Sequence, residues 1–358
     1  MEKGRGKIMK IFYKLLLVVV VVFAVLLISG VLSAQGNSGN AFERVKEVQE
    51  KHTAKLMTIK GVVGTAIGCD PQEQPDIKVF VEEPGVAGIP KKLDDVSVEV
   101  VVTGKIYALP KPEGNPGGGK PPSQSIDPKG WFPRPVPIGV STGNQGEISS
   151  GTIGCRVTDG TNVYALSNNH VYALENDAPI GSSVLQPGRY DTAGYVYNPD
   201  NVIGTLSAFV PIVFSTSASN TIDAAIALSS TANLGNATPS NGYGTPKSTT
   251  VSVWDSVGKQ VQKYGRTTAL TKGKIYAINA TVNVGYSSGT ARFVNQIWVY
   301  SNKPFIKAGD SGSLLVTDPG KNPVGLLFAG DSSGKWGIAN QIDLVLSEFG
   351  VSVDGDGQ

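Results

Sequence analysis

Hydrophobic residues follow three different patterns along this chain of 358 residues. Residues 15–28 form an uninterrupted apolar run. From Ala41 to Met57, apolar residues recur every three to four positions among glutamates, which predicts an amphipathic helix. Elsewhere, short apolar or alternating runs predict strands. The predicted strands cover 61–68, 76–81, 96–102, 152–157, 163–171, 276–284 and 324–330.

These patterns divide the chain into four predicted regions. Residues 1–34 form a targeting segment, and residues 35–109 form a small α+β domain, with a short helix expected to begin at 89–93. Residues 110–135 are rich in Pro and Gly and lack periodicity, which predicts an exposed linker. Residues 136–358 contain the remaining strands, and 340–349 predicts a C-terminal helix.

The first region has the layout of an export signal. Five basic residues precede the apolar run, and small residues follow it, which favours cleavage near Ser33 or Ala34. An uncleaved membrane anchor is the alternative, since residues 15–32 hold 18 uncharged residues, near the minimum for a membrane span. In either case we expect the folded part to be secreted or held on the outer face of the cell membrane.

Composition removes several function classes. The formal net charge is only +2, and no stretch interleaves Lys or Arg with aromatic residues, so we expect no nucleic-acid partner. With two His and two Cys far apart, no metal site or cofactor is predicted. Cys69 and Cys155 are interpreted as small buried hydrophobes, although a bridge between them stays open. The 44 Gly, 22 Pro and 17% charged residues suit a turn-rich extracellular β protein.

One short motif points to chemistry. Residues 308–315 read Ala-Gly-Asp-Ser-Gly-Ser-Leu-Leu, with Ser311 between two glycines. A serine hydroxyl becomes a useful nucleophile when a base takes its proton and dipoles stabilise the oxyanion that forms. Gly309 can adopt a backbone shape that directs its N–H and that of Ser311 to one point. Taken alone, the motif also fits a plain loop between two strands.

The base and the orienting acid can be sought by elimination. His52 lies in a charged helical stretch, whereas His170 ends an apolar strand, where a rigid sheet can present it to a cleft. Asp223 is embedded among small and apolar residues, so burial would demand a partner such as an imidazole N–H. Other acids between the base and the serine have the surroundings of turn residues, namely Asp177, Asp191 and Asp200.

The order His170, Asp223, Ser311 resembles the trypsin/chymotrypsin-like serine peptidases. The motifs that carry the resemblance are Asn-Asn-His-Val, Ile-Asp-Ala-Ala-Ile-Ala and Gly-Asp-Ser-Gly-Ser, together with Gly-Arg-Thr-Thr at 265–268 and the run 324–330. They span roughly residues 136–350. Bacterial members related to the plant narrow-leaf family are the most similar subgroup.

The resemblance implies a mainly β fold, a double six-stranded antiparallel β-barrel preceded by the small α+β domain. It also implies a serine endopeptidase that cleaves peptide or protein substrates through an acyl-enzyme. His170 would be the base, Asp223 would orient it, and Ser311 would attack. The backbone N–H groups of Gly309 and Ser311 would form the oxyanion hole.

Departures from the trypsin pattern change the expected specificity and activation. The residue six before the nucleophile is Phe305, where trypsin has an aspartate. With Phe328, Ala329 and Gly330 as the other expected pocket residues, the pocket should prefer an uncharged, small or apolar P1 side chain. Residues 134–139 do not match an activation site, so insertion of a new N-terminus beside the aspartate of the serine motif is not expected.

Two other functions remain open. One is a non-enzymatic binding or regulatory module on the same fold, which a broken triad would favour. The other is a protease held inactive by residues 35–109, since an auxiliary or pro-domain on a Pro/Gly-rich tether could reach the catalytic surface. A folding helper or a substrate-docking module would use the same arrangement.

Overall fold

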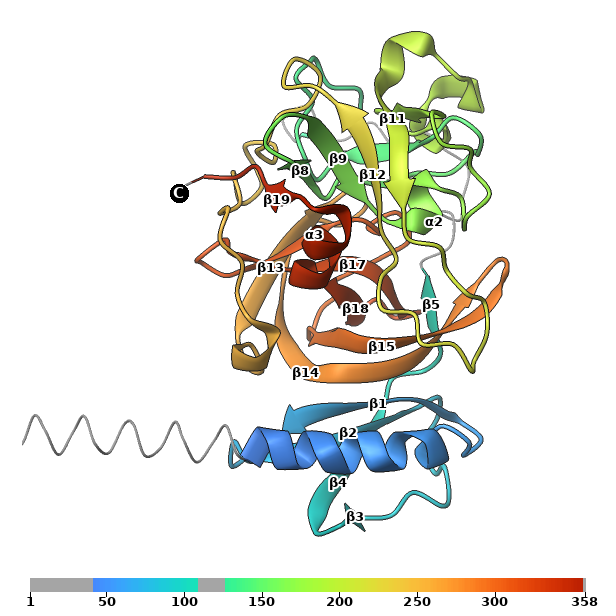
Figure 1. Cartoon of the computed structure of the whole chain (residues 1–358), viewed down its shortest axis with the longest axis vertical. Coiled ribbons are helices and arrows are strands. Elements are labelled where there is room, and N and C mark those ends of the chain that lie inside the picture. The colour runs from blue at the N-terminus through green and yellow to red at the C-terminus, as the bar shows by residue number, and fades with distance from the viewer. Residues whose placement is uncertain (1–40, 109–125, 357–358) are drawn as a thin grey trace, which may run out of the picture.

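Two curled, mostly antiparallel sheets stacked along the long axis dominate the computed structural model, which describes residues 41–108 and 126–356 (Figure 1). The predicted signal segment and most of the predicted linker lie outside the described residues. The expectation of a mainly β protein is confirmed. No helix in 41–108 or 126–356 is long and apolar enough to cross a membrane.

The first sheet has eight strands in the order β19-β8-β9-β12-β11-β10-β6-β7. It supplies most of a hydrophobic core to which the C-terminal helix α3 and residues of the second sheet, such as Tyr264, Leu314 and Leu326, also contribute. Three short 3-10 turns, η1 to η3, lie beside it. The elements are β6 Ser141–Asn144, β7 Gly151–Thr152, β8 Cys155–Thr158, β9 Val163–Ser167, α2 Asn169–Tyr172, β10 Ser183–Leu185, η1 Arg189–Asp191, η2 Ala193–Tyr195, η3 Pro199–Asn201, β11 Val202–Phe209, β12 Ala225–Ser229 and β19 Ser352–Val353.

The second sheet contains a closed ring of six antiparallel strands, as expected of this fold. The strands follow the order β13-β16-β17-β18-β15-β14, and β13 pairs again with β14 to close the ring. The C-terminal helix predicted at 340–349 is α3. The elements are η4 Val253–Asp255, β13 Gln260–Gly265, β14 Ala269–Tyr286, β15 Gly289–Tyr300, β16 Leu314–Thr317, β17 Pro323–Asp331, β18 Trp336–Gln341 and α3 Ile342–Phe349.

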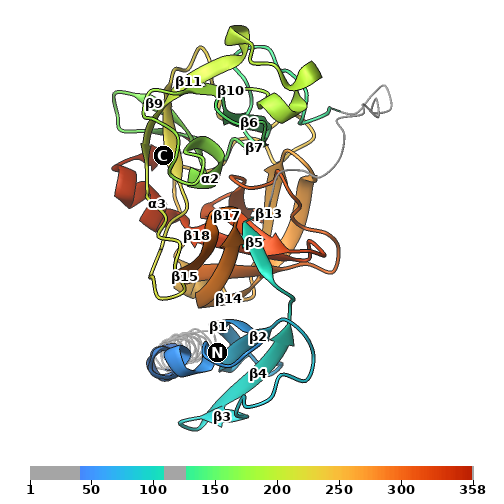
Figure 2. The ribbon, with the colours of Figure 1, turned by 90° about the vertical axis from the view of Figure 1, so that its right-hand side faces the viewer.

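The N-terminal segment extends the second sheet. It consists of a helix at 41–56 and the strands β1 Val62–Cys69, β2 Pro75–Val81, β3 Lys92–Leu93, β4 Val96–Val102 and β5 Ile106–Ala108. Strand β1 pairs antiparallel with β14, with Gly64 opposite Val282. Glycine is needed there because a Cβ would lie 2.8 Å from the Thr281 carbonyl oxygen. Figure 2 shows this segment below β14, with β5 rising beside β17.

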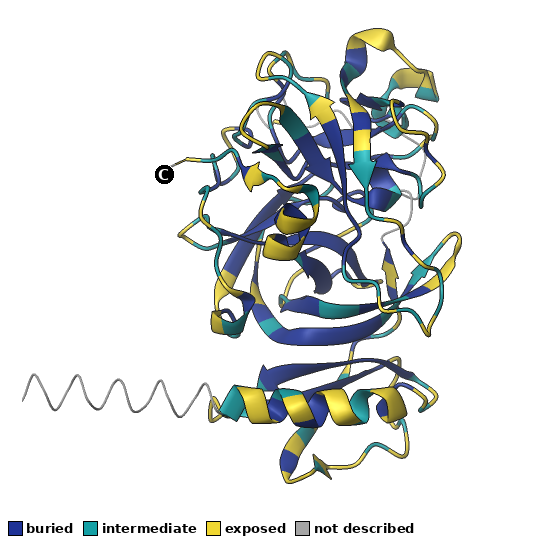
Figure 3. Cartoon of the chain, in the orientation of Figure 1, coloured by how far each residue is buried: buried dark blue, intermediate teal, exposed yellow. Residues whose placement is uncertain are grey.

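Polar contacts and burial fix this segment in place. The Asn279 amide on β14 donates to Gln49 Oε1 at 2.8 Å, and Gln49 is almost fully buried. Figure 3 shows buried residues along β1 and the adjoining part of β14, whereas the helix 41–56 turns an exposed face outward. The middle of β14 is therefore buried on both faces, and its alternation is clear only in its first half. The segment is attached through a shared sheet as well as through a tether.

Several local expectations were wrong or can be refined. Residues 89–93 do not begin a helix, because Lys92–Leu93 forms β3 and pairs with β4. The described end of the predicted linker, 126–135, packs on the first sheet, where Arg134 donates to the Asp200 carbonyl at 2.7 Å. Cys69 and Cys155 are both free, and burial raises the pKa of Cys155 to about 12. The second cysteine thus behaves as a buried hydrophobe.

Candidate active site

Strand pairing brings the predicted base and acid together. His170 lies in the single turn of α2, directly after β9, and Asp223 lies two residues before β12. These strands are antiparallel neighbours, with Ala225 opposite Ser167, so the residues just beyond that end of the pair face each other. The His170 Nδ1 atom is 2.6 Å from Asp223 Oδ2, and the His170 backbone N–H donates to Oδ1 at 3.2 Å.

Asp223 is fully buried and held from several sides. The Tyr286 hydroxyl donates to its Oδ2 at 2.9 Å, and its own backbone N–H donates to Asn340 Oδ1. Burial, followed by the charge of Asp223, raises the pKa of Tyr286 well above its usual value, so this phenol stays protonated and acts as a donor. A buried carboxylate with several donors keeps one orientation, which in turn orients the imidazole.

The carboxylate sets the basicity of His170. Burial by itself would lower the pKa of the imidazole, because a charged ring loses hydration. The charge of Asp223 and its hydrogen bond act in the opposite direction and outweigh burial, so the pKa of His170 is raised above 6.5. Within the described residues, His170 Nε2 is buried and has no hydrogen-bond partner, which leaves it available to accept a proton.

The nucleophile turn is shaped by its two glycines. Gly309 and Gly312 both have φ of +92°, and a Cβ on Gly309 would lie 2.7 Å from Arg266 Nη1 and from Thr267 Oγ1. Glycine is therefore required for conformation and for space. The Thr152 hydroxyl fixes the turn further by donating to the Gly309 carbonyl at 2.8 Å.

The arrangement of carbonyl groups leaves two N–H groups free. The Ala308 carbonyl accepts from Thr267 Oγ1 at 2.6 Å, and the Asp310 carbonyl accepts from Ser313. In a trans peptide the N–H points away from the carbonyl, so the N–H groups of Gly309 and Ser311 point to the opposite side. Neither donates to a protein acceptor within the described residues. The predicted oxyanion-hole donors are thus unpaired.

Asp310 holds the nucleophile turn in place through contacts with residues 263–268. It is fully buried and lies 3.4 Å from Lys263 Nζ, whose pKa is lowered by burial. It also accepts from the backbone of Thr267 and Thr268 and from the Thr268 hydroxyl at 2.7 Å. The Gly-Arg-Thr-Thr motif therefore holds the nucleophile turn, and Asp310 has its full set of partners without a new N-terminus.

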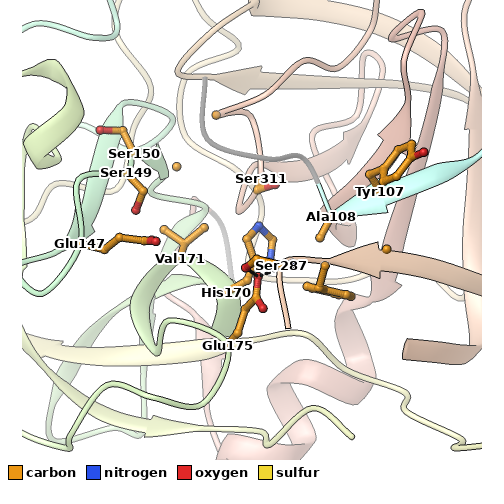
Figure 4. Close-up of a pocket in the computed structure, with 14 residues that line it drawn as sticks. Tyr107, Ala108, Glu147, Ser149, Ser150, His170, Val171, Glu175, Ser287 and Ser311 are labelled. Atoms are coloured by element: carbon orange, nitrogen blue, oxygen red, sulfur yellow. Dashed lines mark hydrogen bonds between the residues drawn. The ribbon is translucent and has the colours of Figure 1, made fainter. Parts of the chain in front are cut away.

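The serine and the histidine face one cavity of about 450 Å³ between the two sheets. Figure 4 shows Ser311 beside the His170 ring, with Glu147 and Ser149 at one end of the cavity and Tyr107 at the other. The Ser311 hydroxyl donates to the Phe328 carbonyl at 3.3 Å, so the expected bond to His170 is not formed. Catalytic hydrogen bonds are often long or poorly aligned in free enzymes and tighten only when substrate binds.

None of the four predicted pocket residues is among the residues that line this cavity. Phe305 is fully buried in the core of the second sheet, where its ring would lie 3.3 Å from a Cβ on Gly337. The Phe328 side chain lies in a second core cluster and packs on Phe293. Ala329 and Gly330 pair with β5. Their assignment to the specificity pocket stays a prediction.

Two functional groups escaped the sequence analysis. Tyr286 ends β14, and nothing in its surroundings along the chain signals that its hydroxyl reaches Asp223. Asp191 ends the 3-10 turn η1, as a turn residue should, but its side chain is 6% exposed and also forms a two-point ion pair with Arg266. The signal in the sequence is Arg266, a charged residue in the otherwise small and polar Gly-Arg-Thr-Thr motif, which would need a carboxylate partner if it were buried. Among the described residues, no group of His, Cys, Asp and Glu could hold a metal ion.

Comparison with known proteins gives structural similarity only. No family model and no curated protein matches the chain. Among solved structures, a glutamic acid specific serine protease matches with 22% identity and a TM-score of 0.44, over 61% of this chain and 100% of that chain. Nocardiopsis protease (18%, 0.43) and Thermobifida fusca protease A (19%, 0.43) also match over 61% of this chain, and over 98% and 97% of their own.

The chain is similar to chymotrypsin-like serine proteases. Its finer relation to the plant narrow-leaf family stays a prediction. At these identities and TM-scores the similarity concerns the fold alone.

Proposed function

We propose that this protein is a serine endopeptidase that hydrolyses peptide bonds through His170, Asp223 and Ser311. The observation that supports this most strongly is the His170–Asp223 pair, at 2.6 Å, beside the same cavity as Ser311 and two backbone N–H groups without an acceptor among the described residues. These parts are what acyl transfer needs: a nucleophile, an oriented base and dipoles for the oxyanion.

The proposed reaction follows from these positions. His170 Nε2 takes the Ser311 proton as the hydroxyl attacks the scissile carbonyl carbon. The carbonyl oxygen becomes an oxyanion, which the N–H groups of Gly309 and Ser311 bind. The imidazolium, stabilised by Asp223, gives its proton to the leaving amine, and an acyl-enzyme remains. Water then attacks the acyl group in a second round of the same steps, with His170 again as the base.

Substrate, cofactor and location are proposed in coarser terms. The substrate is a peptide or protein with an uncharged, small or apolar P1 side chain, because the predicted pocket residues Phe305, Phe328, Ala329 and Gly330 carry no carboxylate. No cofactor is needed for this chemistry. We also propose that the chain acts outside the cytoplasm, either secreted or anchored by residues 15–32, on the basis of its N-terminal sequence.

The decisive test is labelling by a fluorophosphonate, followed by mass-spectrometric mapping of the adduct. A proteolytic function requires the adduct on Ser311. A folded protein that is not labelled at any serine would refute the proposal and favour a non-enzymatic binding module. Labelling on another serine would refute the assignment of the nucleophile.

The pH dependence should report on His170. Only the neutral imidazole can accept the serine proton, and Asp223 raises the pKa of the ring above 6.5. We expect the rate of labelling to be low in acid and to rise with pH, with a midpoint above 6.5. The measurement is the pseudo-first-order labelling rate between pH 5 and 9, with circular dichroism to show that the fold persists. A flat profile would contradict the role of this histidine.

Removing the Tyr286 hydroxyl should weaken the triad without breaking it. Tyr286→Phe deletes one donor to a buried carboxylate, so the carboxylate becomes more basic and favours the protonated imidazolium. We expect about a tenfold loss of labelling rate at neutral pH, the size of one hydrogen bond to a charged group. The midpoint of the pH profile should also move upward. Equal loss at every pH would indicate a merely structural role for the phenol.

A further inference from the structure

The short strand β5 of the N-terminal segment lies in the cleft itself. It pairs antiparallel with β17, with Ile106 opposite Asp331, Tyr107 opposite Gly330 and Ala108 opposite Ala329. It also pairs in parallel with β14. Its last two residues, Tyr107 and Ala108, line the same cavity as His170 and Ser311.

The direction of β5 leads toward the nucleophile. From Ile106 to Ala108 the paired residue on β17 moves back along that strand, from residue 331 to 329. The residue that precedes Ala329 on β17 is Phe328. The carbonyl of Phe328 accepts the Ser311 hydroxyl. The chain therefore enters the cavity with its carboxyl end toward the serine, as the acyl half of a peptide must when its scissile carbonyl is attacked.

Burial and neighbouring contacts hold β5 there. Ile106 and Ala108 are 2% and 7% exposed and belong to the cluster that contains Phe80, Phe328 and Ala329. The same N-terminal segment is fixed to β14 through β1, so β5 is presented to the cleft by a rigid support. Such an arrangement gives a ligand a high effective concentration, which external peptides must overcome.

We propose that β5 is a built-in ligand of the peptide-binding edge of β17, which keeps the full chain closed to extended substrates. Extended peptides bind by adding a strand to an open sheet edge, and here residues 329–331 are already paired. The proposal rests on the proposed function, because a covered edge matters for turnover only if the cavity cleaves peptides. The role of the segment is then inhibitory.

The experiment compares two substrates of different size on the full chain. A small sulfonyl fluoride reacts with the serine and does not need β17, whereas a tetrapeptide amide substrate must lie along it. Tyr107→Pro removes the backbone N–H in the middle of β5 and disfavours the strand. Tyr107→Ala is the matched control, since it removes the ring and keeps the N–H.

We expect similar sulfonyl fluoride labelling in the wild-type chain and both variants. Hydrolysis of the tetrapeptide should rise on the order of tenfold or more in Tyr107→Pro, the effect of about 1.4 kcal/mol lost from the competing strand. In Tyr107→Ala the rate of tetrapeptide hydrolysis should rise less. An acetylated peptide amide with the sequence of residues 104–108 should inhibit Tyr107→Pro, and the same peptide with proline in place of tyrosine should not.

The outcomes separate the two proposals. Equal labelling with unchanged tetrapeptide hydrolysis in all three proteins would overturn the inhibitory role of β5 and leave the peptidase intact. Absence of labelling in every folded form would refute the peptidase and the role of β5 with it. If Tyr107→Pro does not fold, Ile106→Ser serves instead, because it weakens the buried anchor of β5 and leaves the backbone able to pair.

Discussion

Ser311→Ala should abolish covalent labelling and lower kcat for peptide hydrolysis by about 10⁶-fold, the scale found when a triad serine is removed. Among the described residues, the hydroxyl that this change deletes has one hydrogen bond, a long one of 3.3 Å to the Phe328 carbonyl, so the fold should be unaffected. Labelling is measured on the full chain, and hydrolysis in the Tyr107→Pro background, where β5 no longer competes. Thermal unfolding should be unchanged within a few degrees.

The same turn offers a matched control. Ser313 lies two residues from the nucleophile and is also buried, but its hydroxyl donates to the Asp310 carbonyl at 2.5 Å and does not line the cavity. Ser313→Ala should cost stability of roughly 1 kcal/mol, as for one lost hydrogen bond, and keep most of the labelling. Undiminished labelling in Ser311→Ala, or complete loss in Ser313→Ala, would contradict the assignment of the nucleophile.

The site residues that can be predicted from the sequence are those that depend on residue type and order along the chain. His170 is one of two histidines and ends an apolar strand, Asp223 is an acid in apolar surroundings that needs a partner, and the pairing of β9 with β12 brings them within 2.6 Å. Gly309 was chosen for its backbone freedom, and its φ of +92° agrees. Periodicity predicts the helix at 41–56, which turns one face to a core, and a strand at 276–284 within β14, although the middle of β14 is buried on both faces.

Other features depend on the register between distant strands, which periodicity does not encode. Residues 61–68 predicted a strand, but nothing in that run indicates that its partner is β14, more than 200 residues away. Ile106–Ala108 is too short to give a pattern, so its pairing with β17 could not be foreseen. The tether composition suggested free movement of the N-terminal segment, whereas shared sheet pairing and the Gln49–Asn279 contact fix it.

The second large effect concerns the acid. Asp223→Asn should lower the rate of labelling and of peptide hydrolysis by about 10⁴-fold, as in the well-studied triads where the amide selects the wrong imidazole tautomer. The pKa of His170 should also fall, because the negative charge that raises it is gone. The rate is compared with the wild-type chain across pH, and the loss should persist at high pH, where the imidazole is neutral in both proteins.

Asp191→Asn tests whether a second buried aspartate contributes to stability or to the labelling reaction. Asp191 pairs with Arg266 and accepts the Ser141 hydroxyl at 2.6 Å, so the amide leaves a buried guanidinium without its counter-charge. Breaking such a pair costs about 3–5 kcal/mol, seen as a lower denaturant midpoint. Since Arg266 packs against Gly309, some loss of labelling is expected, but far below that of Asp223→Asn in the fraction that stays folded. If the folded fraction lost 10⁴-fold as well, Asp191 rather than Asp223 would be the acid that serves the base.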